Sequence, residues 1–343
     1  MKKFLLVVFL TLGLPILLLM VVYVWTDPFC NLSGFDINNV DATNREYLST
    51  ELFLRNKDNY SYDSFVFSSS RGGGINTYTW KMYLPEGAQP FLFQAWSETL
   101  TGILMKMQYI QKNNIPLRNV LVLMDIPGTF AKKQLPSESL SIKHYLFTGQ
   151  PRWVYNGIQF YNFIQSPSLW AKSIERTLKH EKYPFASDMI TNDYDVKNRV
   201  DYTILPAQDS LKYCSNMTRQ TFFAKIANKS EQDIQMAQPI ITDAFVSQLR
   251  DIKLIFDQNK TDYHILITPA YCYTSQYINS VDLCILQDIF GKDRVHDYSA
   301  PNALNKDYNN FSDPSHFDLH AGFIMLQEIY TDTIIVQKYP RAL

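Results

Sequence analysis

Cysteine is scarce in this chain, and so is any concentration of positive charge. Four cysteines occur in 343 residues and none forms a Cys-x-x-Cys pair, which argues against a disulfide-built scaffold and a cysteine-based zinc site. An oxidising compartment would still permit Cys272 to pair with Cys284. The formal net charge is -1 and the lysines are dispersed, whereas nucleic-acid binding requires clustered positive charge. We therefore expect no nucleic-acid partner.

Long hydrophobic runs are also few, and the clearest one lies at the N-terminus. Residues 4–25 form an uncharged apolar stretch directly after Lys2 and Lys3, long enough to cross a bilayer as a helix. A cleaved signal peptide is the main alternative, but its apolar region is usually shorter and ends in a small-x-small site. We expect an uncleaved anchor in the lipid bilayer, with residues 1–3 cytoplasmic and the main domain extracytoplasmic.

The remaining chain has the composition of a folded protein, with 46% hydrophobic and 14% aromatic residues. Residues 26–62 are polar and mixed, and we interpret them as a connector with one short helix. Short apolar runs then alternate with helically spaced apolar residues. This pattern predicts an α/β domain over 63–343 with a mainly parallel five-stranded sheet and an insertion at about 128–238. The predicted strands are 64–68, 91–95, 120–124, 263–268 and 294–298.

In open α/β sheets the ligand site lies at the carboxyl ends of the strands. The segments to inspect are therefore those that follow the predicted strands: 68–74, 95–98, 125–128, 269–273 and the loop before Asp313.

Asp313-Pro314-Ser315-His316 allows two interpretations. Asp313 and His316 are three positions apart, so on one helical turn the carboxylate could orient the imidazole as a catalytic base. Asp is also a good N-cap and Pro is favoured at the first helical position, so Asp313-Pro314 could simply start the last helix. Only a nucleophile elsewhere in the chain would favour the first interpretation.

Ser70 is the nucleophile candidate. It follows the predicted strand 64–68 in Ser69-Ser70-Arg71 and precedes three glycines. A serine hydroxyl needs an adjacent base, and the amide beside it can help to hold an oxyanion. The alternative is a solvated Ser- and Gly-rich turn.

Together these two segments resemble the SGNH (GDSL-type) hydrolase superfamily. Residues 65–71 resemble its first block and Asp313-x-x-His316 its last, within a resemblance that spans roughly 63–335. It implies a three-layer α/β/α sandwich, flavodoxin-like in type, with Ser70 as nucleophile, His316 as base and Asp313 as orienting acid. The Ser-Ser-Arg variant is similar to membrane-anchored members that serve cell-envelope and exopolysaccharide assembly.

Two positions depart from the family pattern. The second block normally supplies a glycine amide to the oxyanion hole. The matching turn here has no glycine, but the backbone amide of Ser97 could donate in its place, together with the amide of Ser70. The third block normally places an Asn, but this strand ends in Asp125, whose ionised carboxylate would repel an oxyanion. Arg71 could bind an anionic substrate group or form an ion pair with Asp125, and we favour the ion pair. Arg71 and Asp125 remain substrate-binding candidates.

We expect neither metal nor cofactor. His316 and His320 could ligate zinc from one helix face, but they lack the Glu of a His-Glu-x-x-His motif.

The leading hypothesis is a serine esterase or acyltransferase that acts on an acyl ester of a cell-surface glycan. The alternatives are a catalytically degenerate SGNH-like subunit that binds glycan or a membrane-embedded partner, and a purely structural anchored protein. Distances among Ser70, His316 and Asp313 would help to choose between them.

Overall fold

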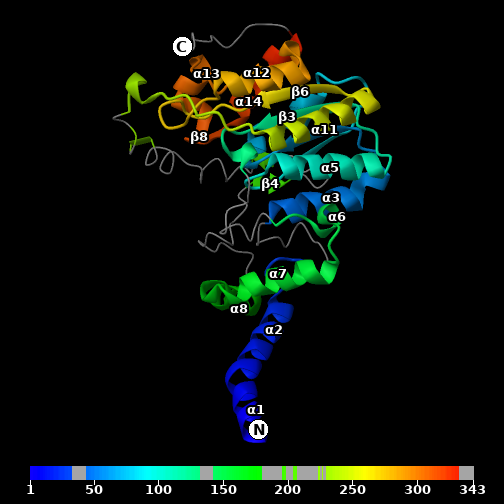
Figure 1. Ribbon diagram of the computed structural model, residues 1–343, viewed down its shortest axis with the longest axis vertical. Helices are drawn as coiled ribbons and strands as arrows, with labels where there is room; N and C mark the ends of the chain where they lie inside the picture. Colours follow the sequence, from blue (N-terminus) through cyan, green and yellow to red (C-terminus); the bar gives the residue numbers. More distant parts are fainter. Residues whose placement is uncertain are drawn as a thin grey trace. The chain divides into compact units, whose positions relative to one another are not determined.

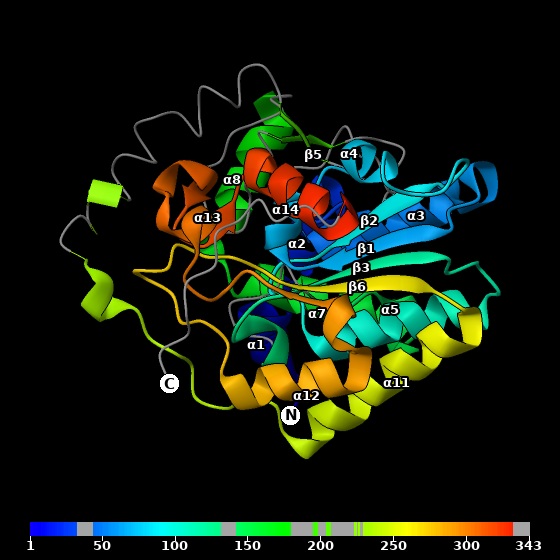
Figure 2. The same ribbon diagram turned by 90° about the horizontal axis from the view of Figure 1, so that it is seen from above.

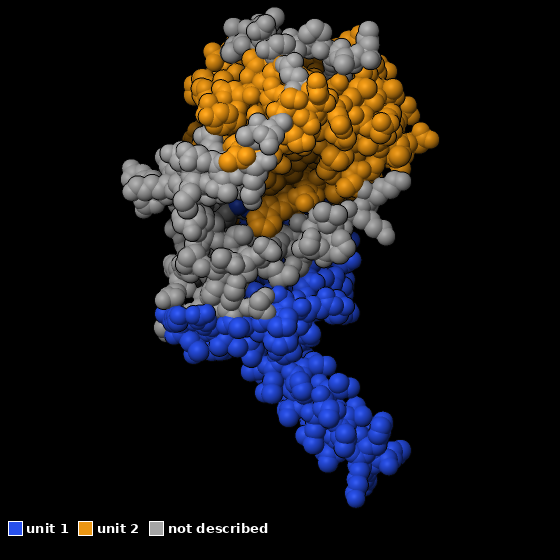
Figure 3. Space-filling model, turned by 90° about the vertical axis from the view of Figure 1, so that its left-hand side faces the viewer, with its two compact units in different colours: residues 1–48, 136–193 blue, residues 49–135, 194–343 orange. Residues whose placement is uncertain are grey.

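The computed structural model describes residues 1–32, 44–131, 142–179, 195–197, 204–206, 223–224, 226 and 229–331. The chain forms two compact units, residues 1–48 with 136–193 and residues 49–135 with 194–343 (Figure 3). Part of the expected insertion thus packs with the N-terminal segment. Cys214 and the other residues of 207–222 in the expected insertion lie outside the described residues.

The first unit begins with an apolar helix, Lys2–Thr26, that is long and apolar enough to cross a membrane. It consists of α1 (Lys2–Val8), a π-helical turn (Phe9–Gly13) and α2 (Leu14–Thr26). The π turn ends two residues before Pro15, which has no amide hydrogen to donate to the preceding turn. A membrane-spanning anchor is therefore consistent with the structure by length and composition.

In the described part of the first unit the chain also forms the helices α6 (Tyr145–Thr148), α7 (Arg152–Ile164) and α8 (Pro167–Lys179). The end of α2 meets α7 and α8 (Figure 1). There the ring of Tyr23 lies 5.3 Å, between centroids, from both Phe160 and Phe163 of α7. The aromatic segment of the expected insertion is therefore partly a packing surface for the apolar helix.

The second unit contains a parallel sheet of five strands in the order β2-β1-β3-β6-β7. The prediction of a five-stranded parallel α/β sheet is confirmed, with each strand end within one residue of its expected place. The order reverses between β1 and β3, where open α/β sheets bind ligands. The strands are β1 (Ser64–Ser68), β2 (Pro90–Gln94), β3 (Asn119–Met124), β6 (Asp262–Ile267) and β7 (Val295–Asp297).

Helices line both faces of this sheet (Figure 2). One face carries α5 (Leu100–Lys112), α11 (Asp243–Asn259) and α12 (Ser280–Phe290). The other carries α4 (Thr77–Lys81), α13 (Ala303–Lys306) and α14 (Leu319–Thr331). β1, β2 and β3 are buried along their whole length, as strands covered on both faces must be.

The polar segment 26–62 is more structured than a connector with one short helix. Helix α3 (Arg45–Tyr60) has 16 residues, and its Phe53 is fully buried against Phe65, Phe91 and Phe93 of β1 and β2. Its apolar residues are too few to give a clear helical pattern in the sequence, so the packing partner on the sheet decides its role.

Several short elements lie between the long ones. The small strands are β4 (Asp195–Lys197) with β5 (Ile204–Pro206), and β8 (Phe311–Asp313) with β9 (His316–Phe317). The 3-10 turns are η3 (Ser70–Gly74), η4 (Gly128–Phe130), η5 (Glu231–Asp233), η6 (Lys292–Arg294) and η7 (Tyr308–Asn310).

Candidate active site

Ser70 opens η3, directly beyond the carboxyl end of β1. Ser69 caps this turn, because its hydroxyl accepts a hydrogen bond from the Arg71 amide at 3.1 Å. The buried Gln94, at the end of β2, donates through Nε2 to the Ser70 carbonyl at 2.8 Å. These two contacts fix the turn from both sides. Ser70 is the first residue of η3, so its amide has no hydrogen-bond acceptor within the turn.

Glycine lets this turn approach the C-terminal part of the domain. A Cβ on Gly74 would lie 2.3 Å from the Phe317 ring of β9, and a Cβ on Gly322 of α14 would lie 1.8 Å from the Gly74 carbonyl oxygen. Real side chains do not fit at such distances, so both positions require glycine for close backbone approach. The β8–β9 hairpin can consequently reach η3, which we call the nucleophile turn after its candidate nucleophile, Ser70.

Ser70, His316 and Asp313 form a continuous hydrogen-bonded chain. Ser70 Oγ lies 2.8 Å from His316 Nε2, and His316 Nδ1 lies 2.7 Å from Asp313 Oδ2. A carboxylate only accepts, so in the neutral imidazole Nδ1–H donates to Asp313 and Nε2 accepts from the Ser70 hydroxyl. This is the arrangement of a serine nucleophile, a general base and an orienting acid.

The local structure of this dyad differs from the expectation. Asp313 ends β8 and His316 begins β9, so they are joined by a tight turn and not by a helical turn. The final helix starts only at Leu319, so the prediction that Asp313-Pro314 starts this helix was wrong. Asp313 Oδ1 instead accepts from the amides of Ser315 and His316, at 2.7 and 3.1 Å, which makes it an Asx-type cap of the hairpin turn.

Opposing effects act on the pKa of Asp313. Burial raises the pKa, but the hydrogen bond and charge of His316 and the two turn amides outweigh it and hold the pKa below its ordinary value. Each of these groups favours the ionised carboxylate. Asp313 is therefore charged when it faces His316, as an orienting acid must be.

Asp125 belongs to a second polar cluster beside the same turn. Its carboxylate accepts hydrogen bonds from the hydroxyls of Ser69 and Thr268, the latter at 3.0 Å, and forms an ion pair with Arg71 Nε at 3.7 Å. Arg71 also donates through Nη1 to Thr268 Oγ1 at 2.8 Å. The expected Arg71–Asp125 ion pair is confirmed. The two substrate-binding candidates therefore contact each other.

Ser97 lies in the turn after β2, as expected, and is exposed. Its φ of +48° is in the left-handed region that favours glycine, which is the residue the second block would carry. The next residue, Glu98, forms a fully buried ion pair with Lys106 of α5, which anchors the turn to the domain. Among the described residues, Ser97 forms no hydrogen bond with Ser70, His316 or Asp313.

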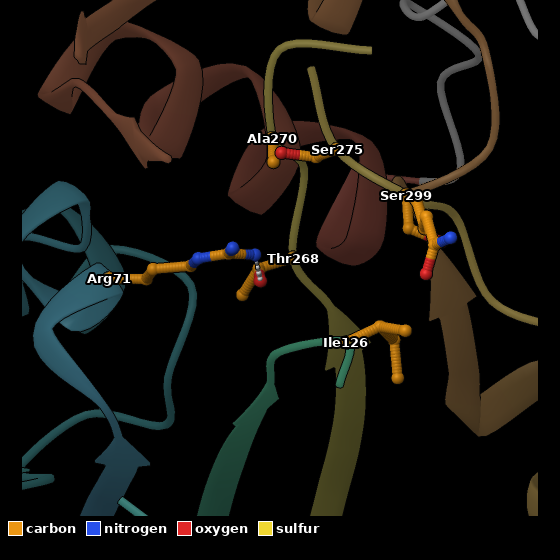
Figure 4. Close-up of a pocket in the computed structure, with 7 residues that line it drawn as sticks. Arg71, Ile126, Thr268, Ala270, Ser275 and Ser299 are labelled. Carbon is orange, nitrogen blue, oxygen red and sulfur yellow. Dashed lines mark hydrogen bonds between the residues drawn. The ribbon is translucent and has the colours of Figure 1, made fainter. Parts of the chain in front are cut away.

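A polar hollow opens on the Arg71 side of the nucleophile turn. In Figure 4 the Arg71 side chain extends across it to Thr268. Arg71 directly follows Ser70 in η3, but the hollow has no space for a water-sized group in this arrangement of side chains. It is lined by Arg71, Ile126, Thr268, Ala270, Ser275, Gln276 and Ser299.

Three residues of this site were missed from the sequence. Gln94 and Thr268 each lie one residue before a segment singled out for inspection, because the strand ends were placed one residue late. Ser69 lay within the segment 68–74 singled out for inspection, but no role was assigned to it. A polar residue at the last position of a buried strand was the available signal for Gln94.

The remaining candidate positions are the possible metal ligands, the cysteines and the other histidines. Among the described residues, no group of three or more His, Cys, Asp or Glu side chains is arranged to hold a metal. His320 is exposed, and Cys272 and Cys284 are not joined in a disulfide. His264 Nδ1 lies 2.8 Å from His296 Nε2, a pairing that the sequence did not reveal.

No protein-family model matches this chain, and no curated protein matches it in sequence. The conclusions about function therefore rest on the geometry of the site.

Proposed function

We propose that this chain is a membrane-anchored SGNH-like serine esterase or O-acyltransferase that acts on an acyl ester of a cell-surface glycan. The observation that carries the proposal is the Ser70–His316–Asp313 chain of hydrogen bonds at 2.8 and 2.7 Å. The ester class follows from the nucleophile and base, while the glycan follows only from the resemblance of Ser69-Ser70-Arg71 and Asp313-x-x-His316 to envelope-associated SGNH proteins.

In the proposed reaction, Ser70 Oγ attacks the acyl carbonyl carbon while its proton moves to His316 Nε2. The tetrahedral intermediate collapses, the ester C–O bond breaks, and His316 returns the proton to the leaving alcohol. The acyl group is then bonded to Ser70. Water, for hydrolysis, or an acceptor hydroxyl, for transfer, then attacks the acyl carbonyl while His316 takes the proton of the attacking oxygen. The bond between the acyl carbon and Ser70 Oγ breaks, and His316 returns the proton to Ser70. Asp313 keeps the imidazole in the required tautomer throughout.

The oxyanion would be held by the amides of Ser70 and Ser97. The Asp125 carboxylate cannot donate, so one donor of the SGNH pattern is missing, which costs about a hundred- to a thousand-fold in rate. Since Ser69, Thr268 and Arg71 occupy this carboxylate, its repulsion of the oxyanion is reduced. We therefore propose a slow enzyme.

We further propose that the helices on the two sheet faces form the three-layer α/β/α sandwich of the SGNH type. The apolar helix Lys2–Thr26 would be the anchor. Lys2 and Lys3 favour a cytoplasmic N-terminus and an extracytoplasmic catalytic domain.

The second candidate function is that of a catalytically degenerate subunit that binds glycan or a membrane-embedded partner in polysaccharide assembly. Asp125 in the place of an amide donor favours it.

The two functions are separated by the reactivity of Ser70. We expect the full-length protein to hydrolyse a p-nitrophenyl acyl ester and to be labelled by a fluorophosphonate, and Ser70→Ala to lose both by at least about a thousand-fold. The matched control is Ser280→Ala, at an exposed serine that starts α12. Equal labelling of wild type and Ser70→Ala would refute the catalytic assignment and favour the degenerate subunit.

A further inference from the structure

Helix α7 has an exposed face that is unusual for a helix in water. Trp153 is 75% exposed and Tyr161 58% exposed, and Ile158 is also exposed. The helix contains a single charged residue, Arg152, at its first position. We call Trp153, Ile158 and Tyr161 the exposed face of α7. Soluble helices usually carry charge on their exposed side, so this face lacks the ordinary features of a water-facing surface.

The opposite side of α7 packs within its own unit. Tyr155, Gln159 and Phe163 are buried, and the Tyr155 ring stacks on Tyr47 of α3 at 5.5 Å between centroids. The Tyr155 hydroxyl accepts from Asn44 Nδ2 at 3.0 Å. These contacts fix the rotation of α7 about its axis, and therefore the direction of its exposed face.

The position of α7 along the apolar helix is also fixed. Its Phe160 and Phe163 contact the ring of Tyr23, which lies within the apolar helix, three residues before its end. The chain after α2 is tied to α7 as well, because Asn31 Nδ2 donates to Asn156 Oδ1 at 2.9 Å and Arg152 Nη2 donates to the Asn31 carbonyl at 3.1 Å. Helix α7 therefore lies at the level where the apolar helix ends (Figure 1).

Helical geometry brings the exposed face toward that same level. Trp153 precedes Phe160 by seven residues, or nearly two full turns, so it projects from almost the same side of α7 as the residue that contacts α2. It lies beyond the reach of α2 itself and is exposed. Trp and Tyr favour the boundary between lipid headgroups and acyl chains.

From these observations we infer that the exposed face of α7 lies in the membrane interface on the side of the main domain, as an amphipathic helix parallel to the bilayer. Its occupant is lipid, at the depth of the headgroup and acyl-chain boundary. The apolar helix and α7 would then hold the first unit to the membrane at two places, which restricts its tilt. This inference depends on the proposed anchor but not on the proposed ester chemistry.

Quenching of tryptophan fluorescence by brominated lipids tests the inference. The full-length protein is reconstituted in phosphatidylcholine vesicles whose acyl chains are brominated near the headgroup. The quenchable emission is compared among wild type, Trp153→Phe and Trp25→Phe, since Trp25 lies at the exposed end of the apolar helix. Trp80→Phe is the matched control, because Trp80 is fully buried in the core of the second unit.

We expect Trp153→Phe and Trp25→Phe each to lose part of the quenchable emission, and Trp80→Phe to lose only emission that lipid does not quench. If Trp25→Phe loses quenchable emission and Trp153→Phe does not, the apolar helix enters the bilayer but α7 does not, so the inference is wrong and another partner covers this face. If neither variant loses any, the anchor and the inference both fail, while fluorophosphonate labelling of Ser70 still tests the enzyme.

Discussion

The turn after β1 has a carboxylate cluster on each side, and the two differ in what they leave available. On one side Asp313 orients His316, whose second nitrogen contacts the Ser70 hydroxyl at 2.8 Å. On the other side Asp125 is surrounded by Ser69, Thr268 and Arg71. Ser70 thus contacts an imidazole nitrogen, which can act as a general base, whereas its neighbour Ser69 donates to the Asp125 carboxylate. We therefore assign the proposed proton transfer to Ser70.

The difference shows that a carboxylate at a strand end is not by itself a catalytic group. Asp125 was the main objection to catalysis in the sequence, because an Asp cannot replace an oxyanion donor. The structure gives it another role, as the partner of an Arg whose side chain is only 12% exposed. We interpret the Asp125 cluster as the support of the nucleophile turn and the Asp313 hairpin as its chemical partner.

The largest expected effect concerns the hairpin side. Asp313→Asn should lower the rate of ester hydrolysis by about a thousand- to ten-thousand-fold, because the amide no longer holds His316 in the tautomer that accepts from Ser70. Initial rates with the p-nitrophenyl ester, together with circular dichroism to verify folding, measure this. The matched control is Asp318→Asn, nearby in the sequence but outside the triad. A folded Asp313→Asn protein with wild-type activity would exclude the triad.

A smaller effect is expected on the other side. Asp125→Asn should lower the free energy of unfolding by about 2–3 kcal/mol, because it leaves the mostly buried Arg71 without its counter-charge. Chemical denaturation measures this. As a control, Asp262→Asn breaks an ion pair with Arg294 whose side chains are 54% and 36% exposed, and should cost at most about 1 kcal/mol.

The rate of ester hydrolysis by Asp125→Asn is a second measurement on this side. An unchanged stability together with a faster ester hydrolysis would mean that the carboxylate faces the oxyanion. The two carboxylates would then both belong to the reaction, and the assignment of Asp125 to support would be wrong.

A second histidine environment differs from that of His316, since His264 pairs with the imidazole of His296 and not with a carboxylate. Burial lowers the pKa of His264 to about 4, below an unfolded value of about 6.5. Between these values the unfolded chain binds more protons, so stability should fall as the pH drops from about 6.5 to 4, by up to about 3 kcal/mol.

Thermal unfolding across this pH range tests the effect. His264→Gln should flatten the slope of stability against pH, whereas the exposed His320→Gln should leave it unchanged. An identical slope in His264→Gln and wild type would show that His264 does not contribute to the acid sensitivity.

Much of the second unit could be predicted because its signals are local. The strands β1, β2 and β3 are short apolar runs that end at or just before a polar residue, and β1 was placed correctly at both ends. Ser70 and the Asp313-His316 spacing were recognised for the same reason. A short helix was expected within 26–62, but the length of α3 and its place in the core were not predicted, because they depend on the packing of Phe53 on the sheet. The β8–β9 hairpin was not predicted either, because Asp313-Pro314 fits a helix start as well as a tight turn.

The sequence by itself determined the apolar helix, the five strands, the candidate nucleophile and the spacing of its proposed acid and base, since each depends on residues within a few positions of one another. The tertiary structure alone decided that Asp125 accepts hydrogen bonds from Ser69 and Thr268, that Gln94 fixes the Ser70 carbonyl, and that α7 packs on the end of α2. These contacts join segments that lie far apart in the chain. Strand order and helix packing determine such contacts, and no local pattern encodes them.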